Sequence, residues 1–213
     1  MARQKEFDRS EVLEKAMQAF WRRGYEATSV QDLVDATGIN RGSMYDTFGD
    51  KRGLFQASVD YYISNVSAKR LSKMIETESA LEAIRTYFED LIAFSVGDGR
   101  KLGCLITNSV VELAPHDPVI GGILRDSFAR VEEIFHQTLR RAQSEGEISP
   151  KVDARAVARF LTATTNGIRV FARADANAET LRDVVSSALS VIEGQQPDLP
   201  VAVDDSFTTT EDA

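Results

Sequence analysis

Residues 28–52 read TSVQDLVDATGINRGSMYDTFGDKR, and this stretch decides how the chain of 213 residues is interpreted. It holds two segments of about eight residues, each apolar on one side only, joined by a turn that contains Gly38. Helices this short are unstable alone and need a neighbour to pack against. Two short helices joined by a glycine turn are typical of a helix-turn-helix, which lays its second helix in the major groove of DNA.

The capping residues around this stretch set the expected helix bounds. Ser29 with Asp32 is a capping box that opens the first short helix, and Gly38 ends it,. Asn40 is suited to cap the second short helix, whose first turn, up to Ser43, is polar and cationic enough to approach base edges,. A longer helix before them starts at Asp8 and stops at Gly24, and closes a small core with them,.

Working outward from this motif, residues 16–55 match the pattern A-x-x-x-F-x-x-x-G-Y-x-x-T-S-V-x-D-L followed by T-G-I-N-R-G-S-M-Y-x-x-F-x-x-K-x-x-L-F, without an insertion. The sequence therefore resembles the TetR family of transcriptional regulators. The resemblance implies phosphate contacts from four residues, Thr28, Ser29, Tyr45 and Lys51. It also implies base-facing positions at Gln31, Arg41, Gly42 and Ser43.

The rest of the chain also has helical periodicity, which predicts an all-α fold of about nine helices,. Further helices are expected over residues 50–73, 78–96, 104–113 and 117–144, then from Ser149-Pro150 to 173, and over 178–193. The predicted organisation is a DNA-binding domain (1–52), a ligand-binding and dimerisation domain (53–193) and an acidic mobile tail (194–213).

The net charge of −8 seems to oppose a DNA partner, because phosphates attract cations,. However, residues 1–52 hold nine Lys and Arg against nine Asp and Glu, whereas six acids and no base follow from Glu193 onward. The acidity therefore lies mostly in the tail and leaves the motif free to bind double-stranded DNA.

The last two long helices have apolar faces too wide for a helix that is covered on one side only. A four-helix interface between two subunits would cover them, so we expect a homodimer that reads a near-palindromic operator. The residues expected at this interface are Val157, Phe160, Leu161, Thr164, Ile168, Leu181, Val185 and Leu189.

About 150 residues beyond the DNA-binding motif suggest a pocket for a small-molecule effector, most simply an uncharged organic compound. Aromatic residues at helical spacing are more often core than ligand contacts, and both interpretations stay open for them. The candidate ligand-binding residues are Tyr62, Phe88, Cys104, Asn108, Glu112, Phe128, Asn166 and Arg169.

Cys104, the single cysteine, follows a loop with Arg100 and Lys101 and precedes a helix, and both features stabilise a thiolate,. Its G-C-L context resembles a TetR subgroup of electrophile-responsive repressors, which implies a sensor role. The alternative is a buried core thiol.

Other classes of protein lack support in the sequence. It contains no G-x-S-x-G, P-loop, G-x-G-x-x-G or H-E-x-x-H pattern, so an enzyme or a protein-binding adaptor is a remote alternative,. With one cysteine and two histidines, no metal site and no cofactor are expected,. Without a long apolar run or a signal-peptide core, a cytoplasmic location away from membranes is expected. The leading hypothesis is a ligand-responsive, homodimeric transcriptional repressor.

Overall fold

The computed structural model describes residues 7–97, 99–175 and 177–193, and all the regular structure in these ranges is helical. The elements are α1 (Arg9–Arg23), α2 (Val30–Thr37), α3 (Arg41–Phe48), α4 (Lys51–Tyr62), the π-helical segment η1 (Ile63–Ser67), α5 (Ala68–Glu76), α6 (Ala80–Val96), α7 (Leu105–Leu113), α8 (Pro118–Ser144), α9 (Ala154–Arg173) and α10 (Ala178–Glu193). Because α4, η1 and α5 follow one another without a break, the described residues form nine continuous helices. The predicted all-α fold of about nine helices is confirmed.

Side-chain caps start the first helices where the sequence predicts. The Asp8 carboxylate accepts a hydrogen bond from the amide of Ser10, and Ser29 and Asp32 form a reciprocal capping box,. The Asn40 side chain accepts from the amide of Ser43 at 2.8 Å. Gly38, at φ +75°, ends α2 in the left-handed conformation that glycine adopts without strain,. The turn between the two short helices is thus fixed by local chemistry.

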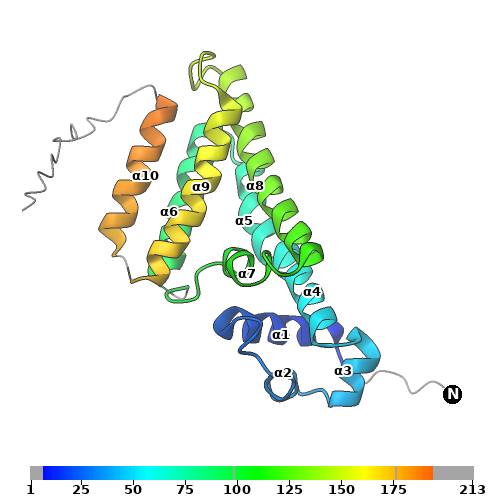
Figure 1. Ribbon diagram of the computed structural model, residues 1–213. Coiled ribbons are helices and arrows are strands. Elements are labelled where there is room, and N and C mark those ends of the chain that lie inside the picture. The colour runs from blue at the N-terminus through cyan, green and yellow to red at the C-terminus, as the bar shows by residue number, and fades with distance from the viewer. Residues whose placement is uncertain (1–6, 98, 176, 194–213) are drawn as a thin grey trace, which may run out of the picture.

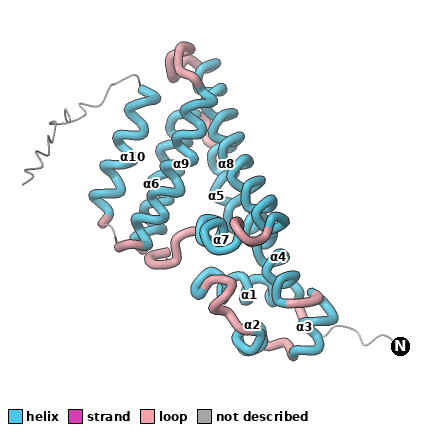
Figure 2. The backbone as a smooth tube through the Cα atoms, in the orientation of Figure 1, coloured by secondary structure: helices cyan, strands magenta, loops and turns pink. Residues whose placement is uncertain are grey.

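The helices fall into a small lower unit and a tall upper bundle (Figure 1). The lower unit consists of α1, α2 and α3, and α4 leaves it to continue through η1 and α5 into the bundle. The bundle consists of α5, α6, α8, α9 and α10, whose axes run roughly alongside one another. Helix α7 lies across the junction and contacts α1, α4 and α8 (Figure 2).

Two hydrophobic clusters hold these parts together. The first joins α1 to α4 with α7 and the start of α8, and Phe20, Leu33 and Met44 are among its most buried members. The second lies inside the upper bundle. Since α4 and α7 belong to the first cluster, apolar packing ties the lower unit directly to the bundle. The division at residue 52 stays a proposal, and the predicted tail, residues 194–213, lies outside the described residues.

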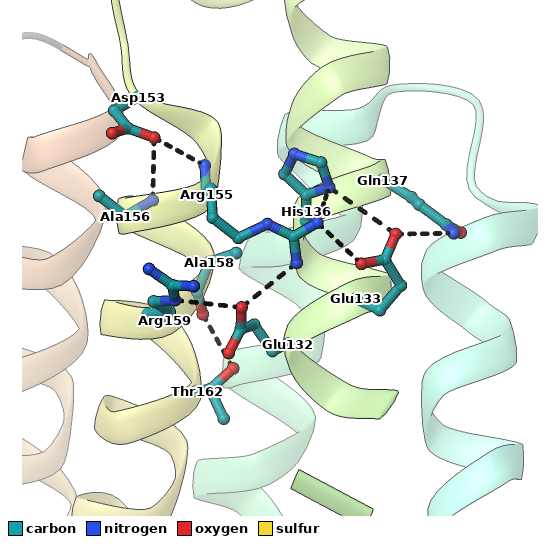
Figure 3. A network of polar contacts seen from close by, with 10 residues as sticks. All are labelled: Glu132, Glu133, His136, Gln137, Asp153, Arg155, Ala156, Ala158, Arg159 and Thr162. Carbon is teal, nitrogen blue, oxygen red and sulfur yellow. Dashed lines mark hydrogen bonds and ion pairs between the residues drawn. The ribbon is translucent and has the colours of Figure 1, made fainter. Parts of the chain in front are cut away.

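A polar network joins α8 to α9 at the surface of the bundle (Figure 3). Arg155 on α9 contacts Glu132 at 3.2 Å, Glu133 at 2.9 Å and the His136 ring at 2.9 Å, all on α8. Arg159 reaches Glu132 at 3.2 Å. These charged contacts join α8 and α9 at the surface, away from the mostly apolar sides that the two helices bury in the second cluster.

Two predicted helix bounds need correction. Helix α9 starts after Asp153, whose carboxylate accepts from the amides of Arg155 and Ala156, and not at Ser149-Pro150. Asp153 is the N-cap of α9 because its carboxylate accepts hydrogen bonds from two otherwise unpaired amides of the first turn. Pro150 lies in a turn before the helix,. The helix predicted over 50–73 extends to Glu76 and contains a π-helical turn. No described helix combines the length and apolar character needed to cross a membrane.

Candidate functional site

Helix α3 is anchored by one side and exposes the other. Met44 is 1% exposed and packs into the first hydrophobic cluster, whereas Tyr45 is 42% exposed. Arg41 and Gly42, in the first turn, are exposed, and Ser43 is partly exposed. Burial of one large apolar side chain stabilises the docking of this short helix by about 2 kcal/mol. The helix, which lies in the lower unit of Figure 1, therefore presents a polar outer face to solvent.

Two further polar side chains lie near this face. Lys51, the first residue of α4, holds its Nζ 4.3 Å from the centre of the Tyr25 ring and 3.5 Å from the carbonyl oxygen of Glu26. A cation–π contact of this kind orients the ammonium without neutralising it. Gln31 is exposed on α2, and its side chain donates to Asp35 at 2.8 Å. The ammonium and the amide are both available to a partner outside the protein.

The phosphate contact expected of Thr28 needs correction. Thr28 is fully buried, and its hydroxyl donates to the carbonyl oxygen of Gly24 at 2.6 Å. Its role is to close the loop between α1 and α2. Ser29 is exposed, but its hydroxyl donates to the carboxylate of Asp32, whose pKa these Ser29 hydrogen bonds and the Arg23 guanidinium hold at about 2.

Glu112 on α7 binds the lower unit, and its role in ligand binding stays a prediction. Its carboxylate accepts hydrogen bonds from the backbone amides of Tyr25 at 3.0 Å and Glu26 at 2.8 Å. Gly24 permits this approach, because a Cβ there would lie 2.9 Å from a Glu112 carboxylate oxygen. The sequence did not predict these contacts, because the two amides are more than 80 residues away from Glu112.

A second contact between the lower unit and the bundle was missed by sequence reasoning. The guanidinium of Arg52 on α4 donates to the carboxylate of Asp117 at 2.7 and 3.0 Å. The same carboxylate caps α8 by accepting from the amides of Val119 and Ile120. The dipeptide Asp117-Pro118 indicates the start of a helix at this point of the sequence. It does not indicate that Arg52 binds the Asp117 carboxylate.

The upper bundle encloses a small cavity between α5, α6, α7, α8 and α9. Three predicted ligand-binding residues line it: Phe128, Asn166 and Arg169. The other lining residues were not predicted. They are Ser67, Arg70, Leu71, Tyr87, Ile106, Ser127, Val131 and Thr165. Arg70 and Thr165 carried no sequence signal, because polar residues are common on helices and their direction depends on the packing.

Cys104 lies beside this cavity as the N-cap residue of α7 and is 2% exposed. Its Sγ is 2.9 Å from Nη1 of Arg169 and accepts from the Tyr62 hydroxyl at 3.6 Å. Burial, the largest single influence, raises the pKa of the thiol, but the Arg169 guanidinium and the hydrogen bonds from Thr107 and Tyr62 together outweigh it, so that the pKa is lowered,. The predicted residues Tyr62, Cys104 and Arg169 are thus brought together as one polar cluster.

Two other predicted ligand residues lie elsewhere. Phe88 is fully buried in the second cluster, where its ring packs against Tyr87 and Phe135. The Asn108 amide donates to the carbonyl oxygen of Leu102 and faces an open groove outside the cavity. The core interpretation of the aromatic spacing is the right one for Phe88.

The expected dimer residues also divide into two groups. Five of them are buried in the core of the single chain, although Val185 also lines an open groove beside Leu189: Val157, Leu161, Ile168, Leu181 and Val185. Helix α9 packs against α6, α8 and α10, and α10 packs against α6 and α9, so the apolar sides of both helices are partly used inside the single chain. Phe160 is 45% exposed, and Thr164 and Leu189 are partly exposed. The exposed face of α9 continues through Gly167 and Val170 to Phe171, which is 50% exposed.

Comparison with known families covers most of the chain. The family model "Bacterial regulatory proteins, tetR family" matches residues 12–58. The model "Tetracyclin repressor-like, C-terminal domain" matches residues 80–188. The first range contains the exposed face of α3, and the second contains the cavity-lining parts of α6, α7, α8 and α9.

Individual relatives agree with these matches. The chain is 36% identical to the HTH-type transcriptional regulator YezE of Bacillus subtilis, over 91% of this chain and all of that protein. It is 36% identical to the HTH-type transcriptional repressor ComR of Escherichia coli, over 88% of this chain and 90% of that one. A solved structure of a cysteine mutant of the regulator CifR, complexed with 26-base-pair operator DNA, is similar with a TM-score of 0.80 and 28% identity, over 88% of this chain and 98% of that one.

Proposed function

We propose a mode of action for this chain, which belongs to the TetR family of bacterial transcriptional regulators: it represses transcription by binding a near-palindromic operator as a homodimer, and a small-molecule effector releases it. Relatives named as repressors and a relative solved on its operator support the repressor assignment. In this proposal α3 enters the major groove, and the chemistry of the exposed residues assigns each a role.

The observation that carries the proposal is the exposed polar face of α3. Arg41 and Ser43 in its first turn have donors for base edges, and Gly42 between them permits close approach,. Tyr45 and Lys51 flank this turn with a hydroxyl and an ammonium suited to phosphates,. Phosphate contacts fix the helix in its groove, and contacts in the first turn read the sequence.

The homodimer is supported by the exposed apolar face of α9 and α10. Phe160, Val170 and Phe171 on α9 and Val191 on α10 are each at least 42% exposed. Exposed apolar side chains gathered on two adjacent helices mark a protein interface. Pairing this face with its two-fold copy forms a four-helix seam and places two α3 helices on one side of the dimer.

Release of the operator by an effector requires that a change at the cavity reaches α3. Three features connect the two regions. The continuous helix α4–η1–α5 carries Ser67 and Arg70 of the cavity at one end and Lys51 at the other. Glu112 and Asp117 bind the lower unit from α7 and the start of α8. An effector that separates the cavity helices would move these attachments, and the two α3 helices would lose the spacing of the half-sites.

Selection of DNA from a genome tests this function. Purified protein is mixed with sheared genomic DNA from its host, and the retained fragments are sequenced. We expect an inverted repeat in the retained fragments, and Arg41→Ala should relax selection within the half-site while non-specific binding persists. Retention without any shared motif, in the wild type, would contradict the proposal.

A second candidate switch is covalent modification of Cys104, favoured by its contact with Arg169 at 2.9 Å. The thiolate would add to the alkene carbon of an electrophile such as N-ethylmaleimide; the new C–S bond uses the sulfur electron pair, and the neighbouring carbon takes a proton from water. Operator release by N-ethylmaleimide from the wild type but not from Cys104→Ser would support this switch. Equal release of both proteins would remove Cys104 from the mechanism.

A further inference from the structure

The cavity of the upper bundle contains two guanidinium groups that lack a carboxylate partner among the described residues. Arg70 on α5 and Arg169 on α9 both line it. Arg70 lies over the Phe94 ring at 5.0 Å, and Arg169 contacts the sulfur of Cys104. Among the described residues, none of those lining the cavity is Asp or Glu, and neither arginine has a carboxylate within ion-pair distance. Partly buried cations usually pair with acids. Even where the Cys104 thiolate balances Arg169, Arg70 has no anion beside it among the described residues, so this site has room for one negative charge from outside the chain,.

A buried hydroxyl without a hydrogen-bond partner also indicates that this cavity binds a ligand with acceptor atoms. Thr165 is 2% exposed, and its Oγ1 has no hydrogen-bond partner among the described residues. It lines the cavity one helical turn before Arg169 on α9, together with Ser127 on α8. An unsatisfied buried hydroxyl costs free energy that a bound acceptor would recover. The cavity thus offers charged and neutral donors.

The remaining wall is apolar and limits the class of ligand. Leu71, Ile106, Phe128 and Val131 line it beside the donors. We propose that this cavity binds a small organic carboxylate, whose charged group contacts Arg70, Arg169 and Thr165 and whose apolar body packs against Phe128 and its neighbours. The inference rests on the proposed function, because it identifies the chemical class of the effector. It replaces the uncharged compound expected from the sequence.

The closed state of the cavity explains how such a ligand would act. The free volume is about 20 Å³, which is room for about one water molecule,. A carboxylate with an apolar body enters only if α5, α8 and α9 separate, so the ligand prefers an opened state. Ser67 is the last residue of the π-helical turn η1, and Arg70 lies in the first turn of α5. Opening of the cavity would therefore move the continuous helix that α4 begins at Lys51. Carboxylate binding and operator binding therefore oppose each other.

The test compares carboxylates with their uncharged amides. Benzoate, 4-phenylbutyrate and hexanoate, and the three matching amides, are titrated into the full chain without DNA at pH 7.5. Binding is followed by the fluorescence of Trp21, the single tryptophan, whose ring lies 5.1 Å from that of Tyr62 and 6.0 Å from that of Phe94. The melting temperature gives a second readout. Arg70→Gln and Arg169→Gln remove the charges, and the exposed Arg130→Gln on α8 is the matched control.

We expect at least one carboxylate to bind about tenfold or more tightly than its amide, because a charge-assisted hydrogen bond contributes that much. Arg70→Gln and Arg169→Gln should each weaken this binding about tenfold, and Arg130→Gln should not. If Arg169→Gln unfolds the protein, the carboxylate affinity of Arg70→Gln alone tests the proposal. Equal binding of amides and carboxylates, or no binding of any carboxylate to a wild type that binds its operator, overturns this inference and leaves the proposed function standing. Failure to select any operator instead overturns the proposed function.

Discussion

Arg52 and Asp117 form a two-point ion pair at 2.7 and 3.0 Å, and the Asp117 carboxylate also caps the first turn of α8. One carboxylate therefore joins the start of α4, next to Lys51, to the start of the longest helix of the bundle. The Arg52 guanidinium and the amide of Ile120 hold the pKa of Asp117 at about 2. The contact is thus charged at every physiological pH.

The first prediction concerns this contact. Asp117→Asn keeps an acceptor for the cap but loses the charge that holds Arg52, so the two α3 helices should be less well spaced. We expect operator affinity about fivefold lower, at the low end of allosteric coupling, with an unchanged affinity for a single half-site. Fluorescence anisotropy measures both. Asp126→Asn, an exposed acid on α8, is the control, and wild-type affinity of Asp117→Asn for the full operator would contradict the prediction.

The same ion pair predicts an acid limit to stability. The pKa of Asp117 is about 2 in the folded chain against an ordinary value of 3.8. Because the folded pKa is the lower one, the stabilisation is present above pH 3.8 and is lost as the pH falls toward 2. Chemical unfolding of the wild type and Asp117→Asn should show a stability difference that shrinks over this interval. A difference that is constant from pH 5 to pH 2 would exclude the ion pair as its cause.

The phosphate contacts predict how salt affects DNA binding. Lys51→Ala should lower affinity for all DNA sequences and reduce the slope of log K against log salt by about 1, because one fewer counterion is released. Tyr45→Phe should lower affinity without changing that slope, since only a neutral donor is lost. Lys69→Ala, an exposed lysine on α5 away from α3, serves as the control. An unchanged slope for Lys51→Ala would place its ammonium away from the DNA.

The dimer face predicts a change of oligomeric state without a change of fold. Phe160 and Phe171 are exposed in the single chain, so Phe160→Glu and Phe171→Glu should leave the helical content unchanged. Burying their charges in an apolar seam costs several kcal/mol, so we expect monomers at micromolar concentration. Sedimentation velocity measures this, with Val111→Glu, 77% exposed on α7, as the control. A dimeric Phe160→Glu/Phe171→Glu double variant would show that the subunits meet elsewhere.

The contact between Arg169 and Cys104 predicts the titration of the thiol. The lowered pKa means that the folded state favours the thiolate, so its stabilisation is full above pH 9, the ordinary pKa, and is lost as the pH falls through the folded value,. Arg169→Gln should raise the pKa of Cys104, because burial then acts without an opposing charge. Thiolate absorbance at 240 nm, with Cys104→Ser as the blank, follows the titration. An equal or lower pKa in Arg169→Gln would contradict this origin.

Local chemistry made the lower unit predictable from the sequence. The capping box of Ser29 and Asp32, the cap at Asn40 and the left-handed Gly38 act within a few residues of one another. Such interactions depend on the order of residues and not on the rest of the fold. The bounds of α2 and α3 could therefore be predicted from the sequence, and so could the family.

Contacts between distant segments were not predictable in the same way. The sequence marked α9 and α10 as widely apolar but did not reveal which side of α9 packs on α6 and α8, or which side of α10 packs on α6 and α9. Buried residues such as Leu161 were therefore predicted at the interface. The carboxylate of Glu112 accepts from amides 86 and 87 residues away, and Arg70 and Arg169 line one cavity only because α5 and α9 pack in the same bundle. Which residues come together in this way depends on how the helices pack. Hydrophobic periodicity in a single sequence predicts the helices but not their packing.

The central claim is that two α3 helices of one dimer read an inverted repeat, and hydroxyl-radical footprinting on a selected genomic fragment tests it most directly. The account predicts two protected regions per strand on one face of the DNA, centred about one helical turn or a whole multiple apart and related by the two-fold axis of the repeat. Phe160→Glu/Phe171→Glu should lose both protected regions together at the concentration where the wild type protects them. A single protected region for the wild type, or protection spread evenly along the fragment, would contradict the claim.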